Sequence, residues 1–277
     1  MSDDYKPVLR PGSDPLVFFP FPGADQPAEV AKGHIMACAI ARALKDGERV
    51  VMGANSLLPM SAARLAQHTH APNLTIIAGA SGGVNTLVEP LVPSSGDYAN
   101  LVAEAVLQFH EVLMLQMSGH ADVFFAGGLQ IDRQGNCNLA YVGEAARPTL
   151  RGPGSAGVPW AQQSARTILY TTSHTRRVFV PRVDFVSYPG WQSSGNGDRR
   201  GGPQLVVTPL AVMGFSDGGE MRLVSLHPGV SLEQVRENTG FDLVLPEGEV
   251  STTLEPSALE LRLLREMDPD ALLTVVV

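Results

Sequence analysis

The sequence contains only two cysteines, Cys38 and Cys137, among 277 residues. Two thiols do not make a disulfide framework, and the start of the chain lacks the basic and apolar regions of a secretory signal. No apolar run approaches the roughly 18 residues that a membrane-spanning helix needs. These absences predict a cytoplasmic protein without a membrane segment.

Positive charge is also scarce, with 20 lysines and arginines against 28 acidic residues and a formal net charge of −8. Nucleic acids and anionic membranes are bound through basic patches, so neither is an expected partner. The hydrophobic content of 44% and the charged content of 17% are typical of a soluble globular protein. The chain is long enough to bury a large core, in one α/β domain or in two small ones.

The order of the apolar segments predicts parallel strands. A proline-rich segment, residues 1–27, is expected to form an extended arm, and residues 28–277 are expected to form the main domain. A strand is predicted at 49–52, a helix at 60–68 and a strand at 74–78. This β–loop–α–β order favours parallel pairing with a right-handed crossover.

Further elements follow along the chain. Helices are predicted near the start of the domain and at 102–117, 231–238 and 255–267. Strands are predicted at 121–126, 166–172, 178–180, 204–207 and 222–226.

The most informative stretch is the apolar segment Leu74–Ala78 and the turn Gly79-Ala80-Ser81-Gly82-Gly83 that follows it. A buried strand that stops at several glycines is typical of a place where a ligand approaches the backbone closely. The same five residues match the G-x-S-x-G pattern of a serine hydrolase. That pattern requires a helix directly after the serine and an acid and a histidine downstream. Pro90 and Pro93 oppose the helix, so a glycine-rich turn is favoured and a serine hydrolase using Ser81 is the weaker alternative.

Two other patterns suggest cofactors. Gly152–Gly157 fits G-x-G-x-x-G, but Arg147-Pro148-Thr149 before it is not expected to be a strand, and no carboxylate follows until Asp184. A chain reversal is therefore expected, without a dinucleotide. His68 and His70 have no cysteine or carboxylate cluster beside them, so a helix end is favoured over a metal site.

Asp132 and Asn136 follow the glycine pair Gly127-Gly128 at the end of a predicted strand. Their side chains can contact a ligand at this place. They can equally hydrogen-bond their own backbone around Gly135 in a hairpin. Both interpretations stay open at this point.

Taken in order, these segments resemble the β subunit of the class I CoA-transferase family over about residues 28–245. The segments that carry the resemblance are Gly127–Asn138, Gly152–Gly157, Arg176–Phe185, Tyr188–Gly190, Val207–Val212, Ser225–Val230 and Glu237–Phe241. The resemblance implies an open, mainly parallel α/β sheet flanked by helices. It also implies a companion α subunit in an α₂β₂ assembly, with acyl-CoA bound between subunits and no separate cofactor.

In that family the β subunit carries Glu-x-Gly-x-x-Gly, and the glutamate attacks the thioester. Here the motif corresponds to Ala80–Asn85, so Ala80 replaces the glutamate and Asn85 replaces the last glycine. An alanine methyl group is no nucleophile, so no catalytic residue is expected on this chain. One similar branch, the heteromeric hydrolases that open steroid rings as CoA thioesters, also works without this glutamate. We therefore expect hydrolytic carbon–carbon cleavage of a cyclic or β-keto acyl-CoA.

The substrate-binding residues expected from this resemblance lie on several strand-end turns, and their backbone amides near Ser81 are expected to donate hydrogen bonds. They are Gly79, Ala80, Ser81, Gly82, Gly83, Asn55, Ser56, Gly127, Gly128 and Gln130. The alternatives are true CoA transfer, with a carboxylate from the partner or from Glu89, and a degenerate subunit that only stabilises its partner.

Overall fold

The computed structural model describes residues 30–54, 56–191 and 201–275. The predicted arm over residues 1–27 and the candidate Asn55 lie outside this part of the chain. Within the predicted domain over 28–277, the chain forms two compact units. The first holds the described residues up to Val112 together with Pro256–Val275, and the second holds Leu113–Glu255.

The first unit contains four strands in the order β1-β2-β3-β4. They are β1 (Arg49–Met52), β2 (Thr75–Ala78), β3 (Gly83–Thr86) and β4 (Ala103–Val106). β1 and β2 run parallel with Val50 opposite Ile76, as the sequence predicts, whereas β3 and β4 add antiparallel pairs. The parallel pair is possible because α2 (Leu57–His68) provides the crossover between β1 and β2.

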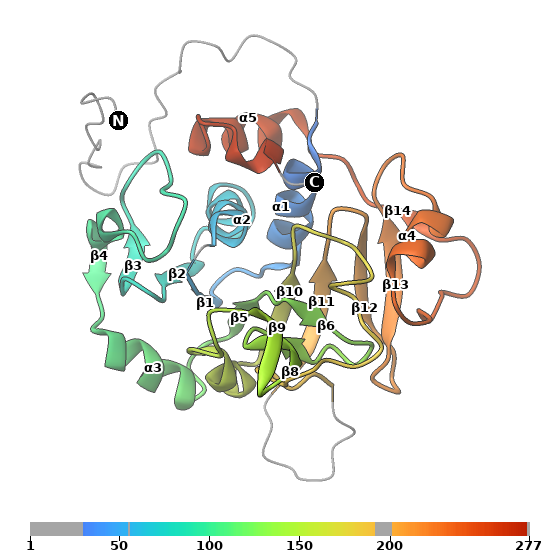
Figure 1. Cartoon of the computed structure of the whole chain (residues 1–277). Coiled ribbons are helices and arrows are strands. Elements are labelled where there is room, and N and C mark those ends of the chain that lie inside the picture. The colour runs from blue at the N-terminus through green and yellow to red at the C-terminus, as the bar shows by residue number, and fades with distance from the viewer. Residues whose placement is uncertain (1–29, 55, 192–200, 276–277) are drawn as a thin grey trace. The chain divides into compact units, whose positions relative to one another are not determined.

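Three helices of the first unit, α1 (Lys32–Ala43), α2 and α5 (Ala258–Met267), pack against one another (Figure 1). The α1 face that contains Met36 and Ile40 is fully buried. Arg42 of α1 also donates two hydrogen bonds to the Glu260 carboxylate of α5, at 3.0 and 2.7 Å. The C-terminal helix is therefore held to the first unit by both packing and an ion pair.

Six strands of the second unit pair side by side in the order β14-β13-β12-β11-β10-β5. They are β5 (Val123–Ala126), β10 (Arg166–Tyr170), β11 (Pro203–Val207), β12 (Ala211–Phe215), β13 (Met221–Leu226) and β14 (Ser251–Thr252). β10 pairs in parallel with β5 and β11, and antiparallel strands follow from β11 to β13. The prediction of an open, mainly parallel α/β sheet with flanking helices is confirmed.

Smaller elements complete the described chain. They are β6 (Gln130–Ile131) with β7 (Cys137–Asn138), β8 (Tyr141–Glu144) with β9 (Arg147–Arg151), α3 (Phe109–Met117), α4 (Leu232–Asn238), and the 3₁₀ turns η1 (Tyr98–Leu101), η2 (Val158–Gln163) and η3 (Leu272–Val275). Ser231 caps α4 by accepting a hydrogen bond from the Gln234 amide, 3.2 Å away. None of the helices in the described residues is long and apolar enough to span a membrane.

Three predictions of local structure are wrong. The single helix expected at 102–117 is instead strand β4 followed by the shorter helix α3. Residues 147–149, expected not to be a strand, begin β9, which pairs with β8. The strand expected at 178–180 is reduced to one bridge between Phe179 and Ile131. At 102–106, pairing with β3 outweighs the local preference for helix.

Candidate functional site

The candidate site begins where β1 and β2 end side by side. Because the two strands are parallel and in register from Arg49 and Thr75 onward, Met52 and Ala78 lie at the same edge of the sheet. The chain turns immediately after Ala78, and the Gly79 amide donates a hydrogen bond to the Met52 carbonyl, 2.9 Å away. The carboxyl ends of parallel strands are where ligands bind in open α/β sheets.

The backbone of this turn requires glycine at Gly82. Its φ of +91° is unfavourable for other residues, and an added Cβ would lie 1.9 Å from the Leu107 carbonyl oxygen. Asn85, where the family pattern has glycine, also has a positive φ of 47°. Asparagine tolerates this conformation, and its Oδ1 accepts a hydrogen bond from the Ile76 amide at 2.9 Å. The departure at Asn85 therefore preserves the turn.

A second segment, residues 94–97, closes over the turn, and the sequence did not single it out. The Ser81 amide donates to the Ser95 carbonyl at 3.1 Å, and the buried Ser95 hydroxyl donates to the Gly53 carbonyl. The buried Ser56 hydroxyl donates to that same carbonyl. Ser95 thus joins segment 94–97 to the loop after β1 and to the turn after β2, whereas Ser56 bonds within the loop after β1.

Ala80 itself is exposed at the surface of this turn. A Cβ built on Gly96 would lie 3.5 Å from the Ala80 methyl carbon, so segment 94–97 faces it directly. The amides of Ser81 and Gly82 donate to the Ala78 carbonyl, at 3.2 and 2.7 Å. These two amides are therefore occupied within the turn, which limits the predicted donor role of Ser81–Gly83.

The arrangement does not support a serine nucleophile. The Ser81 hydroxyl lies 3.4 Å from the Ala78 carbonyl and contacts no basic side chain among the hydrogen bonds of the described residues. The chain continues from Gly83 into strand β3 instead of the helix that a nucleophile elbow requires.

The second unit holds the other predicted binding residues, Gly127, Gly128 and Gln130, at the end of β5. An added Cβ on Gly128 would lie 2.3 Å from the Cys137 sulfur, so this glycine makes room for a neighbouring side chain. The Gln130 side chain is buried and donates to the Asp184 carboxylate at 2.9 Å. The polar groups of this turn are thus satisfied within the protein.

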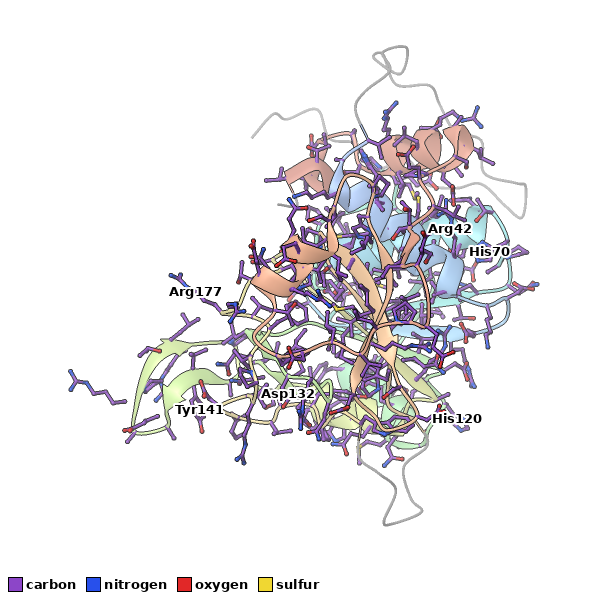
Figure 2. The ribbon with its side chains drawn as sticks, turned by 90° about the vertical axis from the view of Figure 1, so that its right-hand side faces the viewer. Arg42, His70, His120, Asp132, Tyr141 and Arg177 are labelled. Carbon is purple, nitrogen blue, oxygen red and sulfur yellow. The ribbon has the colours of Figure 1, made fainter. Side chains whose placement is uncertain are left out.

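The hairpin interpretation of Asp132 and Asn136 is confirmed. Asp132 Oδ1 accepts hydrogen bonds from the Gln134 and Asn136 amides, each at 3.0 Å, and Oδ2 accepts one from Asn136 Nδ2 at 2.9 Å. Gly135 between them has a φ of +75°. In Figure 2 Asp132 lies nearer the middle of the ribbon than Tyr141 and Arg177 do. The two side chains build the turn between β6 and β7.

Two buried groups near these strand ends have shifted pKa values. Burial raises the pKa of the Cys137 thiol to about 12, and Asp132 adds to this, so the thiol stays protonated. Burial, with the nearby His227, lowers the pKa of His174 to about 4. The His174 ring nitrogens lie 2.8 Å from Thr208 Oγ1 and 3.1 Å from Thr239 Oγ1. The neutral imidazole therefore joins the ends of three segments in the second unit.

The two cofactor patterns have structural explanations. A strand, β9, does precede Gly152, contrary to our expectation, but η2 follows and is only a short 3₁₀ turn. The Gly152 and Gly154 amides donate to the carbonyls of Ala140 and Leu139, at 2.9 and 3.1 Å, which confirms a chain reversal. His70 Nε2 lies 3.1 Å from the Leu44 carbonyl. The described residues contain no group of three or more metal-ligating side chains.

An open α/β sheet with a glycine-rich turn at the carboxyl end of a parallel strand defines a ligand-binding α/β protein. A Coenzyme A transferase family model matches residues 34–238, and the chain belongs to this family.

Relatives of known activity indicate which of the family's two chain types this is. The chain is 34% identical to the B subunit of 3-oxoadipate CoA-transferase from Pseudomonas knackmussii, over 85% of this chain and 92% of that protein. It is 33% identical to the cholesterol ring-cleaving hydrolase IpdB subunit of Rhodococcus jostii, over 88% of this chain and 95% of that protein. The solved structure of the decarboxylase AibA/AibB matches with a TM-score of 0.80 and 27% identity, covering 90% of this chain and 99% of that chain. The chain is thus a B-type member of the family.

Proposed function

We propose that this chain is the B subunit of a heteromeric enzyme that hydrolyses a carbon–carbon bond in a cyclic or β-keto acyl-CoA. The observation that carries the proposal is Ala80. It stands exposed on the strand-end turn, at the position where the family resemblance places an attacking glutamate. The turn around it is intact, so the carboxylate is missing from a preserved scaffold.

The proposed reaction needs no covalent carrier on the protein. Water attacks the keto carbon of the β-keto thioester, and the bond between that carbon and the α carbon breaks. The electron pair passes to the α carbon as a thioester enolate, which is then protonated. The products are a carboxylic acid and an acyl-CoA, joined in one molecule when the ketone is in a ring. The protein must supply a general base and donors for the enolate oxygen.

Neither Glu89 nor Asp97 replaces the missing glutamate. Strand β3 pairs antiparallel with β2 and leads the chain away from the turn, so Glu89 lies beyond the opposite end of that strand. Asp97 lies next to Gly96, but its Oδ1 accepts a hydrogen bond from the Ala99 amide at 2.8 Å and caps η1. A companion A subunit is therefore the proposed source of the base.

The relatives support both this chemistry and one alternative. A ring-cleaving hydrolase and a decarboxylase both break carbon–carbon bonds, and subunits of both resemble this chain. The 34% identity to a 3-oxoadipate CoA-transferase chain favours the alternative, CoA transfer between an acyl-CoA and a carboxylic acid. Transfer requires an acyl-accepting carboxylate, which would then have to come from the companion.

The proposal extends to the assembly and its setting. We propose an α₂β₂ complex in the cytoplasm, with CoA as part of the substrate and no separate cofactor. Steroid breakdown is the proposed pathway, because this chain resembles a subunit of a cholesterol ring-cleaving hydrolase.

The deciding experiment uses the co-purified complex with oxocyclohexanecarbonyl-CoA as a cyclic β-keto probe, in isotopically labelled water. We expect one heavy oxygen atom in the new carboxylate, with the CoA thioester retained in the same molecule. Borohydride added during turnover should leave both subunits unmodified, as seen by intact-protein mass spectrometry.

The alternatives predict other results. CoA transfer predicts a glutamyl thioester trapped on one subunit and movement of CoA onto added acetate. Labelling of Ser81 by a fluorophosphonate would instead indicate a serine hydrolase. Either result would overturn hydrolysis by water without a covalent intermediate.

A further inference from the structure

Gly96 faces Ala80 across a space about as large as a methyl group. A Cβ built on Gly96 would lie 3.5 Å from the Ala80 methyl carbon and 3.4 Å from Ser94 Oγ. Among the described residues, these are the nearest heavy atoms outside Gly96 and its chain neighbours, and both distances are ordinary contacts. Gly96 does not have a positive φ either. The fold therefore does not require glycine here, and the glycine leaves space beside Ala80.

The space beside Ala80 has a polar border. Ser94 Oγ lies against it and accepts a hydrogen bond from the Gly96 amide at 3.1 Å. A hydroxyl has one donor and two acceptor sites, so this bond does not use its whole capacity. A water molecule is similar in size to a methyl group and needs about two to four polar partners to be held in place. Ser94 Oγ can supply one partner, and the substrate and the base can supply the others.

Segment 94–97, which carries Gly96, is held by Asn100. The Asn100 Nδ2 group donates hydrogen bonds to the carbonyls of Ser94 and Asp97, at 3.0 and 3.1 Å, and so joins both ends of the segment. The Asn100 side chain is fully buried, and its Oδ1 has no hydrogen-bond partner among the described residues. A buried acceptor without a partner is unfavourable. The stabilising contribution of this side chain is therefore its hold on segment 94–97.

Segment 94–97 is also tied to the turn that carries Ala80. The Ser95 carbonyl accepts a hydrogen bond from the Ser81 amide at 3.1 Å, and the Ser95 hydroxyl donates to the Gly53 carbonyl. The segment cannot move away from the turn without breaking these bonds. The width of the space is thus fixed by hydrogen bonds on both sides.

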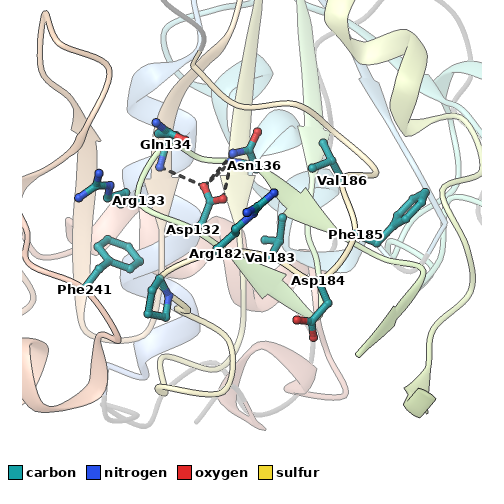
Figure 3. A pocket seen from close by; sticks show the side chains of 11 residues that line it. Asp132, Arg133, Gln134, Asn136, Arg182, Val183, Asp184, Phe185, Val186 and Phe241 are labelled. Carbon is teal, nitrogen blue, oxygen red and sulfur yellow. Dashed lines mark hydrogen bonds between the residues drawn. The ribbon is translucent and has the colours of Figure 1, made fainter. Parts of the chain in front are cut away.

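The acidic groups that line the pocket of the second unit have structural roles instead. That pocket has a volume of about 760 Å³, and its lining includes Asp132 and Asp184 (Figure 3). The Asp132 carboxylate accepts hydrogen bonds from the Gln134 amide and Asn136 Nδ2, at 3.0 and 2.9 Å. Asp184 Oδ2 accepts one from Gln130 Nε2 at 2.9 Å. The companion subunit therefore stays the proposed source of the base.

We propose that the space between Ala80 and Gly96 binds the water that attacks the substrate. Ser94 Oγ is its hydrogen-bond partner on this chain, and Asn100 is a positioning residue that acts through segment 94–97. This inference rests on the proposed function, because it assigns a place to the water of the hydrolysis. The water oxygen bonds to the keto carbon, and one proton of the water passes to the companion's base. The bond to the α carbon then breaks, and the α carbon keeps the electron pair until it is protonated.

Gly96→Ala in the co-purified complex tests the water site, with oxocyclohexanecarbonyl-CoA as substrate. The new methyl group takes the place of the water. We therefore expect kcat to fall at least about tenfold, whereas KM and the thermal midpoint stay unchanged. Gly218→Ala is the matched control, since Gly218 is also exposed and its added Cβ has no atom nearer than 3.7 Å.

A double variant separates the loss of the water from a disturbed loop. Ala80→Gly removes the methyl carbon that lies 3.5 Å from the Cβ of Gly96→Ala, so the two changes together restore the space. We expect the double variant to recover kcat to within about threefold of the wild type, because the two positions are coupled. Asn100→Leu keeps the size of the side chain but removes both donors. It should lower kcat and leave KM nearly unchanged.

The outcomes distinguish the water site from the proposed function. If label from isotopic water enters the product but Gly96→Ala has the wild-type kcat, the water site is wrong and hydrolysis stands. Additive losses of kcat in the double variant would also overturn the water site. If no label enters the product of the wild type, hydrolysis itself is wrong and the water site falls with it.

Discussion

The turn after β2 and the turn after β5 are both glycine-rich ends of buried parallel strands, yet their surroundings differ. After β2, the polar groups of the turn bond to the backbone, and the Ala80 side chain is left exposed. After β5, the Cys137 sulfur and the Gln130–Asp184 pair occupy the space beside the glycines. Glycine at a strand end therefore does not by itself mark a ligand site. What differs is the group packed against the glycines: backbone carbonyls lie against Gly82 and Gly83 after β2, and the Cys137 side chain lies against Gly128 after β5.

The largest test of this comparison is Gly82→Ala. We expect a loss of unfolding free energy on the order of 3 kcal/mol or more, because the new Cβ meets a backbone carbonyl at a positive φ. Urea unfolding of the full chain measures it. Gly218→Ala is the control, since its added Cβ has no atom nearer than 3.7 Å. An equal and small effect for both variants would contradict the structure of the β2 turn.

Acid should act on the second unit through His174. An unfolded histidine titrates near 6.5, whereas burial lowers the pKa of His174 in the folded chain to about 4. Between these values the unfolded chain binds a proton that the folded chain does not, so stability falls as the pH falls from 6.5 to 4. The loss reaches at most about 3 kcal/mol.

His174→Gln isolates this effect, because glutamine can still hydrogen-bond Thr208 and Thr239 but does not titrate. We expect the variant to have a flatter pH dependence of unfolding free energy than the wild type, whereas the exposed His120→Gln should behave like the wild type. Parallel curves for the His174 variant and the wild type would show that the imidazole is not held neutral.

The two turns also show how much of the structure can be predicted from the sequence. The run Leu74–Ala78 and its glycines predict the strand and the turn, whereas the missing nucleophile at Ala80 is an expectation from the family resemblance. Segment 94–97 has no such pattern, because its contact with Ala80 arises only when the chain closes over the turn. Gln130 looks like a binding residue for a similar reason, since its partner Asp184 lies 54 positions away.

The prediction of secondary structure from the sequence has the same limit. Residues 102–117 contain alanine, glutamate, leucine and methionine, which favour helix locally. The first part of this segment nevertheless pairs with β3, with Val106 opposite Gly83, and forms the edge strand β4. Edge pairing is a tertiary effect, so the single-sequence pattern cannot reveal it.

A smaller effect is expected in the β6–β7 hairpin, which follows the β5 turn. Asp132→Asn replaces a carboxylate that accepts hydrogen bonds from Gln134 and Asn136 and places an amide group against the Asn136 donor. We expect a loss of about 1–3 kcal/mol in unfolding free energy and little change in turnover. The exposed Asp242→Asn is the control. A large fall in turnover with unchanged stability would mean that this carboxylate acts on substrate.

The smallest change in stability is expected in the turn after β2, where Ala80→Gln should alter unfolding free energy by less than about 0.5 kcal/mol because the side chain is exposed. Its effect on turnover should be much larger, at least about tenfold, since glutamine fills the space left by the missing glutamate, where we place the attacking water, without supplying a nucleophile. Ala145→Gln makes the same change at an exposed position of the β8–β9 hairpin and should leave turnover unchanged. Turnover that is equal in the two variants would place the chemistry elsewhere. Gln and Glu are similar in size, so comparing Ala80→Gln with Ala80→Glu separates the effect of side-chain volume from the effect of the carboxylate. A thioester trapped only on the Ala80→Glu variant would show that this turn still holds the geometry of the transferases.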